Sequence, residues 1–246
     1  MTTLAQIKRE FAALFFSPIA YVLLTGAVII NGGIFITIVN FLSDPRAGHG
    51  AAMQYLFGGT IFFWFLVLVI CPLITMRSLA EESHSGTLET LLTAPISDAQ
   101  VVLAKYTAAV GFWIALWLPT LTYVFFLSRF SRIDPGPITA GYLGTLGLGM
   151  MFLAVGLFCS AMTKNQIVAS LLAFSINMIL FLLGVAEFLS QSQSSDSILN
   201  YLNLWTHMDE FGRGIVDTRH LVYYLSVTGF VLFSTVQVVQ SRRWRG

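Results

Sequence analysis

The chain has 246 residues, of which 56% are hydrophobic and only 10% are charged, with a net charge of +1 and a mean hydropathy of +0.78. Soluble domains carry about 25% charged residues, so this chain has too little polar surface to cover a globule in water, and lipid must surround much of it. Composition therefore excludes an ordinary soluble domain, and the near-zero net charge gives no indication of nucleic-acid binding.

Residues 3–17 have the pattern of an amphipathic helix. Apolar residues recur at helical spacing and share one face: Leu4, Ile7, Phe11, Leu14 and Phe15. The polar residues off that face are Gln6, Lys8, Arg9 and Glu10. We expect an interfacial helix in the head-group plane, basic on its wet side. A signal peptide is the alternative, but the apolar run after Pro18 is too long for one and lacks an Ala-x-Ala site.

Six apolar runs follow, and each is long enough to cross a bilayer, which needs about 20 residues per helix. Their approximate limits are 19–42, 55–76, 101–127, 140–162, 166–189 and 220–240. The chain is thus predicted to be an all-α integral membrane protein with six transmembrane helices in a single domain, 1–246. The fourth run is rich in small residues, which allow close helix packing: Gly141, Gly144, Gly147, Gly149, Gly156 and Ser160.

The basic residues are distributed unevenly between the two sides that six spans define. With the N-terminus inside, eight of the 13 Lys and Arg residues fall on the inner side and five on the outer side. The inner set is Lys8, Arg9, Arg77, Lys105, Lys164, Arg242, Arg243 and Arg245; the outer set is Arg46, Arg129, Arg132, Arg213 and Arg219. The positive-inside rule then predicts that both termini are cytoplasmic.

The segment 190–219 is the longest stretch outside the spans, and this topology makes it external. It begins with a Ser/Gln run that is typical of a flexible linker. Tyr201 and Trp205 follow, and such residues favour the membrane interface. We expect short external re-entrant helices here.

Between two long apolar runs lies one polar segment, 77–100, which the same topology places in the cytoplasm. Its charged residues are Arg77, Glu81, Glu82 and Glu89, with His84 among them. A leucine stripe at i, i+3 and i+4 predicts a short amphipathic helix: Leu88, Leu91 and Leu92. Thr87, after Gly86, is a plausible start, and Pro95 ends the pattern because its ring forbids continuation.

Motifs for catalysis are absent from the sequence. No Gly is followed by Lys, so there is no phosphate-binding loop, and neither His-Glu-x-x-His nor Cys-x-x-Cys occurs. An external metal site is conceivable, although a solvated loop is the simpler interpretation of its candidate ligands: His207, Asp209, Glu210 and His220. The spans contain almost no acidic residues to couple an ion gradient. Asn177 is the polar residue in a span that we single out as a weak candidate for a substrate pathway.

The polar segment also carries a family resemblance. Its string Arg-x-Leu-Ala-Glu-Glu-x-x-x-Gly-Thr-Leu-Glu-x-Leu-Leu-Thr-x-Pro-Ile-Ser, residues 77–97, resembles the first cytoplasmic loop of ABC-2 type transporter permeases. It is most similar to the gliding-motility and nitrous-oxide-cluster type of subunit. Residues 213–225 and 241–245 resemble the same subfamily.

In those permeases the loop after the second span carries a coupling helix that seats in a groove of a separate ATP-hydrolysing subunit. The resemblance implies such a helix at about 83–97. The residues that it implies for ATPase coupling are Arg77, Glu81, Glu82, Gly86, Thr87, Leu88, Glu89, Leu91, Leu92 and Pro95. ATP and magnesium would bind to the partner, and this chain would hold no cofactor, metal or catalytic residue.

The resemblance further implies an exporter subunit in a bacterial cytoplasmic (inner) membrane. It would act with two ATPase copies and a second permease, either identical or homologous, and an envelope accessory protein could join this assembly. The cargo would be lipid-linked, amphiphilic or polymeric, or the subunit would transmit mechanical force instead. A secondary carrier would need intramembrane acids and internal repeats. The sequence also leaves open a membrane enzyme built on Glu81, Glu82, His84 and Glu89, and a scaffold without transport activity.

Overall fold

The computed structural model describes residues 3–42, 56–85, 97–130, 134–190 and 201–243. Within these ranges every regular element is an α-helix. The helices are α1 (Thr3–Phe15), α2 (Pro18–Leu42), α4 (Ile61–Thr75), α5 (Ala80–Ser85), α7 (Asp98–Trp117), α8 (Thr120–Phe130), α9 (Pro135–Met162), α10 (Gln166–Ser190), α12 (Leu204–Gly212) and α13 (Thr218–Arg243). The all-α class predicted from hydropathy is therefore confirmed.

Six helical stretches are long and apolar enough to cross a membrane. They are Pro18–Asn40, Ile61–Ser85, Asp98–Arg129, Pro135–Met162, Gln166–Gly184 and Thr218–Ser241. This result matches the expectation of six spans from apolar runs of about 20 residues. The third stretch is divided, because α7 ends at Trp117 and α8 begins at Thr120. Pro119 lies at this junction and has no N–H to continue the helical hydrogen bonding.

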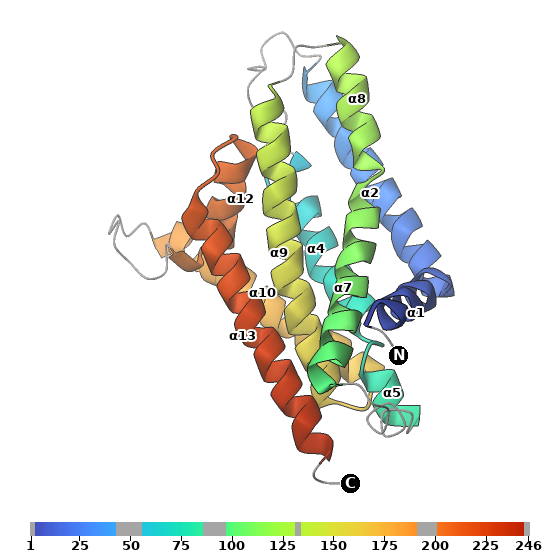
Figure 1. The fold of residues 1–246 in the computed structure, drawn as a ribbon. Helices are drawn as coiled ribbons and strands as arrows, with labels where there is room; N and C mark the ends of the chain where they lie inside the picture. The colour runs from blue at the N-terminus through green and yellow to red at the C-terminus, as the bar shows by residue number, and fades with distance from the viewer. Residues whose placement is uncertain (1–2, 43–55, 86–96, 131–133, 191–200, 244–246) are drawn as a thin grey trace.

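Helix α9 is the central element of the bundle. It contacts α4, α7, α10, α12 and α13, and Figure 1 shows it running through the middle of the molecule. Its glycines lie where other helices approach closely: a Cβ at Gly149 would meet the Trp113 ring, and one at Gly156 would meet the Thr75 hydroxyl. The prediction that this small-residue span packs against other helices is confirmed.

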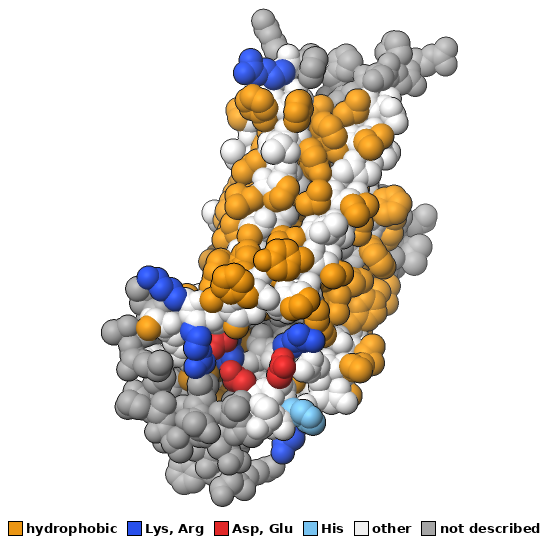
Figure 2. All heavy atoms as spheres, turned by 90° about the vertical axis from the view of Figure 1, so that its right-hand side faces the viewer, with side chains coloured by type: hydrophobic (Ala, Val, Ile, Leu, Met, Phe, Trp, Pro, Cys, Tyr) orange, Lys and Arg blue, Asp and Glu red, His pale blue; other side chains and the backbone are white. Residues whose placement is uncertain are grey.

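The outer faces of the bundle are apolar. Large hydrophobic side chains are exposed along α2, α10 and α13, among them Ile29, Ile36, Ile167, Leu171, Phe230 and Phe233. Figure 2 shows one face on which hydrophobic side chains form a band, with charged side chains gathered below it. Such a band is the surface expected to contact lipid acyl chains.

Helices α1 and α5 and the last turns of α13 lie at the lower end of the bundle in Figure 1, and we call this the α5 end. Helix α12 lies nearer the opposite end. Helix α1 packs on α7, with the Phe15 ring 5.2 Å from that of Phe112. The two basic residues of its polar side, Lys8 and Arg9, are exposed as expected, whereas Gln6 is buried and Glu10 is mostly covered. The last two side chains lose solvent because α1 packs against neighbouring helices.

Candidate functional site

Helix α5 forms part of the polar segment 77–100 and is held in place by α9. The Ser160 hydroxyl of α9 accepts hydrogen bonds from the backbone N–H groups of Leu79 and Ala80, both at 3.0 Å. It also donates to the Met76 carbonyl at 3.2 Å. The first N–H groups of a helix have no partner within it, so a side chain from a distant helix caps α5. This contact fixes the start of α5 against the central helix of the bundle.

A buried lysine ties α5 to two further helices. Lys105 of α7 is 3% exposed, and its ammonium lies 2.7 Å from the Glu82 carboxylate of α5 and 3.0 Å from the Glu10 carboxylate of α1. Burial alone would raise the pKa of the Glu10 carboxyl, but Lys105 and Arg9 outweigh burial and hold that pKa below its usual value. The Glu10 carboxylate is therefore stabilised as an anion, which suits a structural link better than proton transfer.

Arg77 provides a third connection. It lies just before α5, and its Nε donates to the side-chain oxygen of Gln166, at the start of α10, at 3.1 Å. Together with the contacts of Ser160 and Lys105, this bond links the polar segment to α1, α7, α9 and α10. A short polar helix with four neighbours is positioned by the whole α5 end of the bundle.

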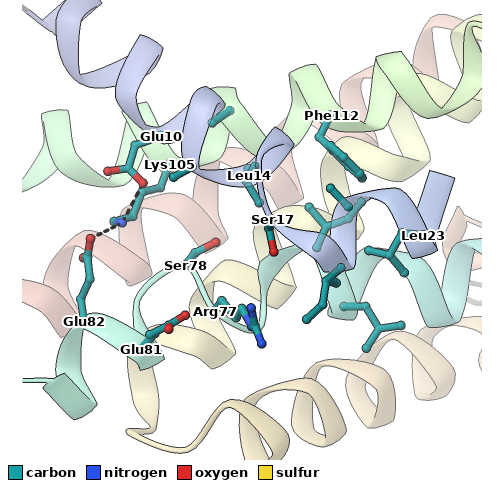
Figure 3. A pocket seen from close by; sticks show the side chains of 16 residues that line it. Glu10, Leu14, Ser17, Leu23, Arg77, Ser78, Glu81, Glu82, Lys105 and Phe112 are labelled. Carbon is teal, nitrogen blue, oxygen red and sulfur yellow. Dashed lines mark hydrogen bonds and ion pairs between the residues drawn. The ribbon is translucent and has the colours of Figure 1, made fainter.

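A cavity of about 370 Å³ lies beside these contacts, among α1, α2, α4, α5 and α7. Its polar lining consists of Glu10, Ser17, Arg77, Ser78, Glu81, Glu82 and Lys105. Its apolar lining includes Leu14, Leu23, Leu73, Ile74 and Phe112. Figure 3 shows Lys105 between Glu10 and Glu82 on one side, Leu23 and Phe112 on the other, and Arg77 between the two sides. The cavity is thus charged at one side and apolar at the other.

The structure places only part of the predicted coupling residues. Arg77, Glu81 and Glu82 all line this cavity. The other seven, Gly86, Thr87, Leu88, Glu89, Leu91, Leu92 and Pro95, lie outside the described residues. The chain is described again from Ser97, whose side chain and that of Gln100 form a capping box that starts α7.

Asn177 is fully buried in α10, and neither atom of its side-chain amide has a hydrogen-bond partner among the described residues. A buried amide without a partner costs free energy. Its assignment to a substrate pathway stays a prediction.

The candidate ligands of an external metal site are rearranged by the fold. Asp209 pairs with Arg213 at 2.7 Å, whereas Glu210 contacts His220 at 2.7 Å. Asp217 takes the place of Asp209, since the ligand atoms of Glu210, Asp217 and His220 lie within 4.8 Å of one another. His207 is buried and stacks on His220 with ring centres 3.8 Å apart. Burial, with a smaller contribution from His220, lowers the pKa of His207 to about 3.

Three residues of the α5 end have no individual role in the sequence-based prediction. Lys105 enters it only as an inner basic residue, Glu10 as part of the polar face of residues 3–17, and Ser160 as a small residue. Lys105 did carry a signal, because a single cation inside an apolar run implies a partner. However, no sequence pattern predicts that this partner is Glu10, which is 95 positions away.

The sequence of the chain was compared with known families. The sequence model of a family described as "ABC-2 family transporter protein" matches residues 36–208, well over half of the chain. No curated protein matches the chain at a significant level. The matched region includes α4, α5, α7, α9 and the buried Lys105–Glu82 pair. The chain belongs to the ABC-2 family of transporter proteins and is a multi-pass permease subunit of an ABC transporter.

Proposed function

We propose that this permease subunit couples ATP hydrolysis by a separate cytoplasmic ATPase to transport, and that the ATPase docks on the polar segment 77–100. One observation carries the proposal: α5 is the short polar helix at the end of the bundle, and it is bonded to several of the helices around it. A force applied at this segment would act on α9 through Ser160 and on α7 through Lys105. A loosely attached loop would absorb the same force.

The docking surface is proposed to be the leucine stripe Leu88, Leu91 and Leu92. An amphipathic helix that places an apolar stripe in a groove is a common recognition mode. Arg77, Glu81 and Glu82 would orient the segment, with Gly86, Thr87, Glu89 and Pro95 shaping the helix and its ends.

The assembly proposed from the family contains two ATPase copies, which bind ATP and magnesium, and a second permease that is identical or homologous. The α5 end would face the cytoplasm of a bacterial cell, so that both termini are cytoplasmic. The excess of basic residues at this end supports that orientation. Assignment to the gliding-motility and nitrous-oxide-cluster subfamily rests on the sequence resemblance alone.

The proposed activity is export of a lipid-linked, amphiphilic or polymeric cargo, or transmission of force to an envelope partner. The apolar spans, with few charges to recognise a small ionic solute, support this class of cargo. Asn177 is a proposed residue of the pathway. A secondary carrier and a scaffold without transport activity are the competing functions.

The test combines a pull-down and an ATPase assay. The chain is expressed with the ATPase subunits of the same cell, purified in mild detergent and reconstituted in proteoliposomes. Leu92→Asp should lose both the bound ATPase and its coupled activity, because a charge in an apolar groove is desolvated without a partner. Thr90→Asp is the matched control, since it adds the same charge off the stripe, and it should retain both.

Unchanged ATPase binding and activity in Leu92→Asp would rule out docking through the leucine stripe. Purification of the wild-type chain without any ATPase would favour a carrier or a scaffold.

A further inference from the structure

The cavity beside α5 has a charged side and an apolar side, and a membrane lipid likewise has a charged head group and apolar acyl chains. Its charged side is formed by residues of the α5 end, and its apolar side by Leu14, Leu23 and Phe112. Since the charged residues lie directly below the hydrophobic band of the bundle (Figure 2), the cavity lies at the level where lipid head groups meet acyl chains. Its volume of about 370 Å³ is within the range of small-molecule sites.

Several charges around this cavity have no ion-pair or hydrogen-bond partner for at least one polar atom within the part of the chain that the structure describes. Among the described residues Arg77 forms no ion pair, and its one side-chain hydrogen bond uses Nε, which leaves the other guanidinium nitrogens available. Glu81 likewise has no ion pair within the described ranges. Of the two carboxylate oxygens of Glu82, one contacts Lys105, whereas Oε2 is buried and has no hydrogen-bond partner among the residues described. Leaving a buried charged acceptor without a donor is costly, so the Glu82 oxygen indicates a ligand, which the exposed Arg77 and Glu81 can also contact.

The balance of these charges selects the kind of ligand. Lys105 is already shared by Glu10 and Glu82, so the available groups are one guanidinium, the Glu81 carboxylate and the free oxygen of Glu82. A purely anionic ligand would satisfy Arg77 but would repel the carboxylates. A ligand with both a phosphate and an N–H-bearing ammonium satisfies all three, because guanidinium binds phosphate well and ammonium donates to carboxylate.

We propose that this cavity binds the head group of an amine-bearing phospholipid, with the phosphate on Arg77, the ammonium on Glu81 and Glu82, and the start of the acyl chains against Leu14, Leu23 and Phe112. The bound lipid would fill the space between α1 and α5 and so connect the interfacial helix to the polar segment. The site is distinct from the proposed ATPase docking surface on the leucine stripe, and does not depend on it.

The test measures head-group selectivity in the full-length chain. Purified, delipidated protein is incubated with equal amounts of phosphatidylethanolamine, phosphatidylcholine and phosphatidylglycerol of identical acyl chains, and retained lipid is quantified by native mass spectrometry. Phosphatidylcholine has no N–H donor and phosphatidylglycerol has no cation. We expect phosphatidylethanolamine to be retained at least about tenfold over both, as the loss of a hydrogen bond to a charged group implies.

Arg77→Gln and Glu81→Gln should each abolish this preference, and both side chains are exposed, so folding should be retained. Arg129→Gln, which removes a cation at the other end of the bundle, is the matched control and should keep the preference. Equal retention of the three lipids by the wild type, or an unchanged preference in Arg77→Gln, would overturn the proposal. Lipid retention is measured in the absence of the ATPase, so its outcome does not depend on the outcome of the Leu92→Asp experiment.

Discussion

Replacing Lys105 by Met should destabilise the protein strongly. Met keeps the apolar stem of the lysine but removes the ammonium that lies 2.7 Å from Glu82 and 3.0 Å from Glu10. The two carboxylates are then left facing each other, and their side chains are only 21% and 13% exposed. Water can therefore replace little of the lost interaction.

The magnitude follows from the behaviour of buried ion pairs. Removing one partner of such a pair typically costs about 3–5 kcal/mol, and the partial exposure of Glu82 favours the lower part of that range. For a chain of this size 1 kcal/mol corresponds to roughly 2–4 °C in Tm, so Lys105→Met should lower Tm by roughly 6–12 °C.

The assay is thermal denaturation in detergent, followed by fluorescence-detected size-exclusion chromatography. Lys164→Met is the matched control, because Lys164 is exposed and forms no ion pair among the described residues, and it should leave Tm nearly unchanged. The triple variant Glu10→Gln, Glu82→Gln, Lys105→Met should recover much of the loss, since no buried charge remains unpaired.

The pH dependence has a definite sign. The pKa of Glu10 is lower in the folded protein than its ordinary value of 4.5, so its stabilising contribution is present above pH 4.5 and is lost as the pH falls below it. The difference between wild type and Lys105→Met should therefore shrink in acid. A Lys105→Met variant as stable as the wild type, or a triple variant no more stable than Lys105→Met, would refute the proposed role of this cluster.

Two further predictions concern single residues. Ser160→Ala should cost about 2–4 kcal/mol, because two buried N–H groups at the start of α5 lose their acceptor; hydrogen exchange should accelerate at Leu79 and Ala80 while α12 is unaffected, and unchanged exchange would contradict the capping role. His207 has a pKa of about 3 in the folded protein against 6.5 ordinarily, so the unfolded chain binds the extra proton and stability should fall as the pH drops below 6.5. Between pH 6.5 and 5 the loss should be roughly 1–2 kcal/mol; His207→Phe should flatten the Tm profile over that interval, and an equally steep profile in the variant would show that another group is responsible.

Much of the architecture could be predicted because membrane insertion is governed by local hydropathy. A run such as 166–189 must be helical in lipid, since only a helix satisfies its backbone hydrogen bonds within one segment. The break between α7 and α8 is likewise a local effect of Pro119. Helix α4 begins at Ile61, six residues after the start of the apolar run at 55. Hydropathy therefore predicts that a span is present but not the residue at which its helix begins.

The candidate site was only partly predictable. Arg77, Glu81 and Glu82 were identified because charge is conspicuous between two apolar runs, and the structure brings all three to one cavity. Helix α5 itself was missed, because six residues are too few to show a periodic apolar pattern. The pairing of Glu10 is not predictable from the sequence, because amphipathicity separates the polar face of a helix from its apolar face but does not show whether a polar side chain meets water or a buried lysine.

The sequence by itself determined that lipid surrounds much of this protein, that it has six spans, and that its polar segment lies between two of them. Each of these follows from side chains that are neighbours along the chain. Only the tertiary structure decided that Lys105 joins Glu10 and Glu82, and that Ser160 caps a helix 80 residues earlier. Such pairings depend on how the helices pack side by side. Packing is set by the shapes of surfaces such as the glycine-rich face of α9, and a local pattern of hydrophobic residues does not predict which surfaces meet.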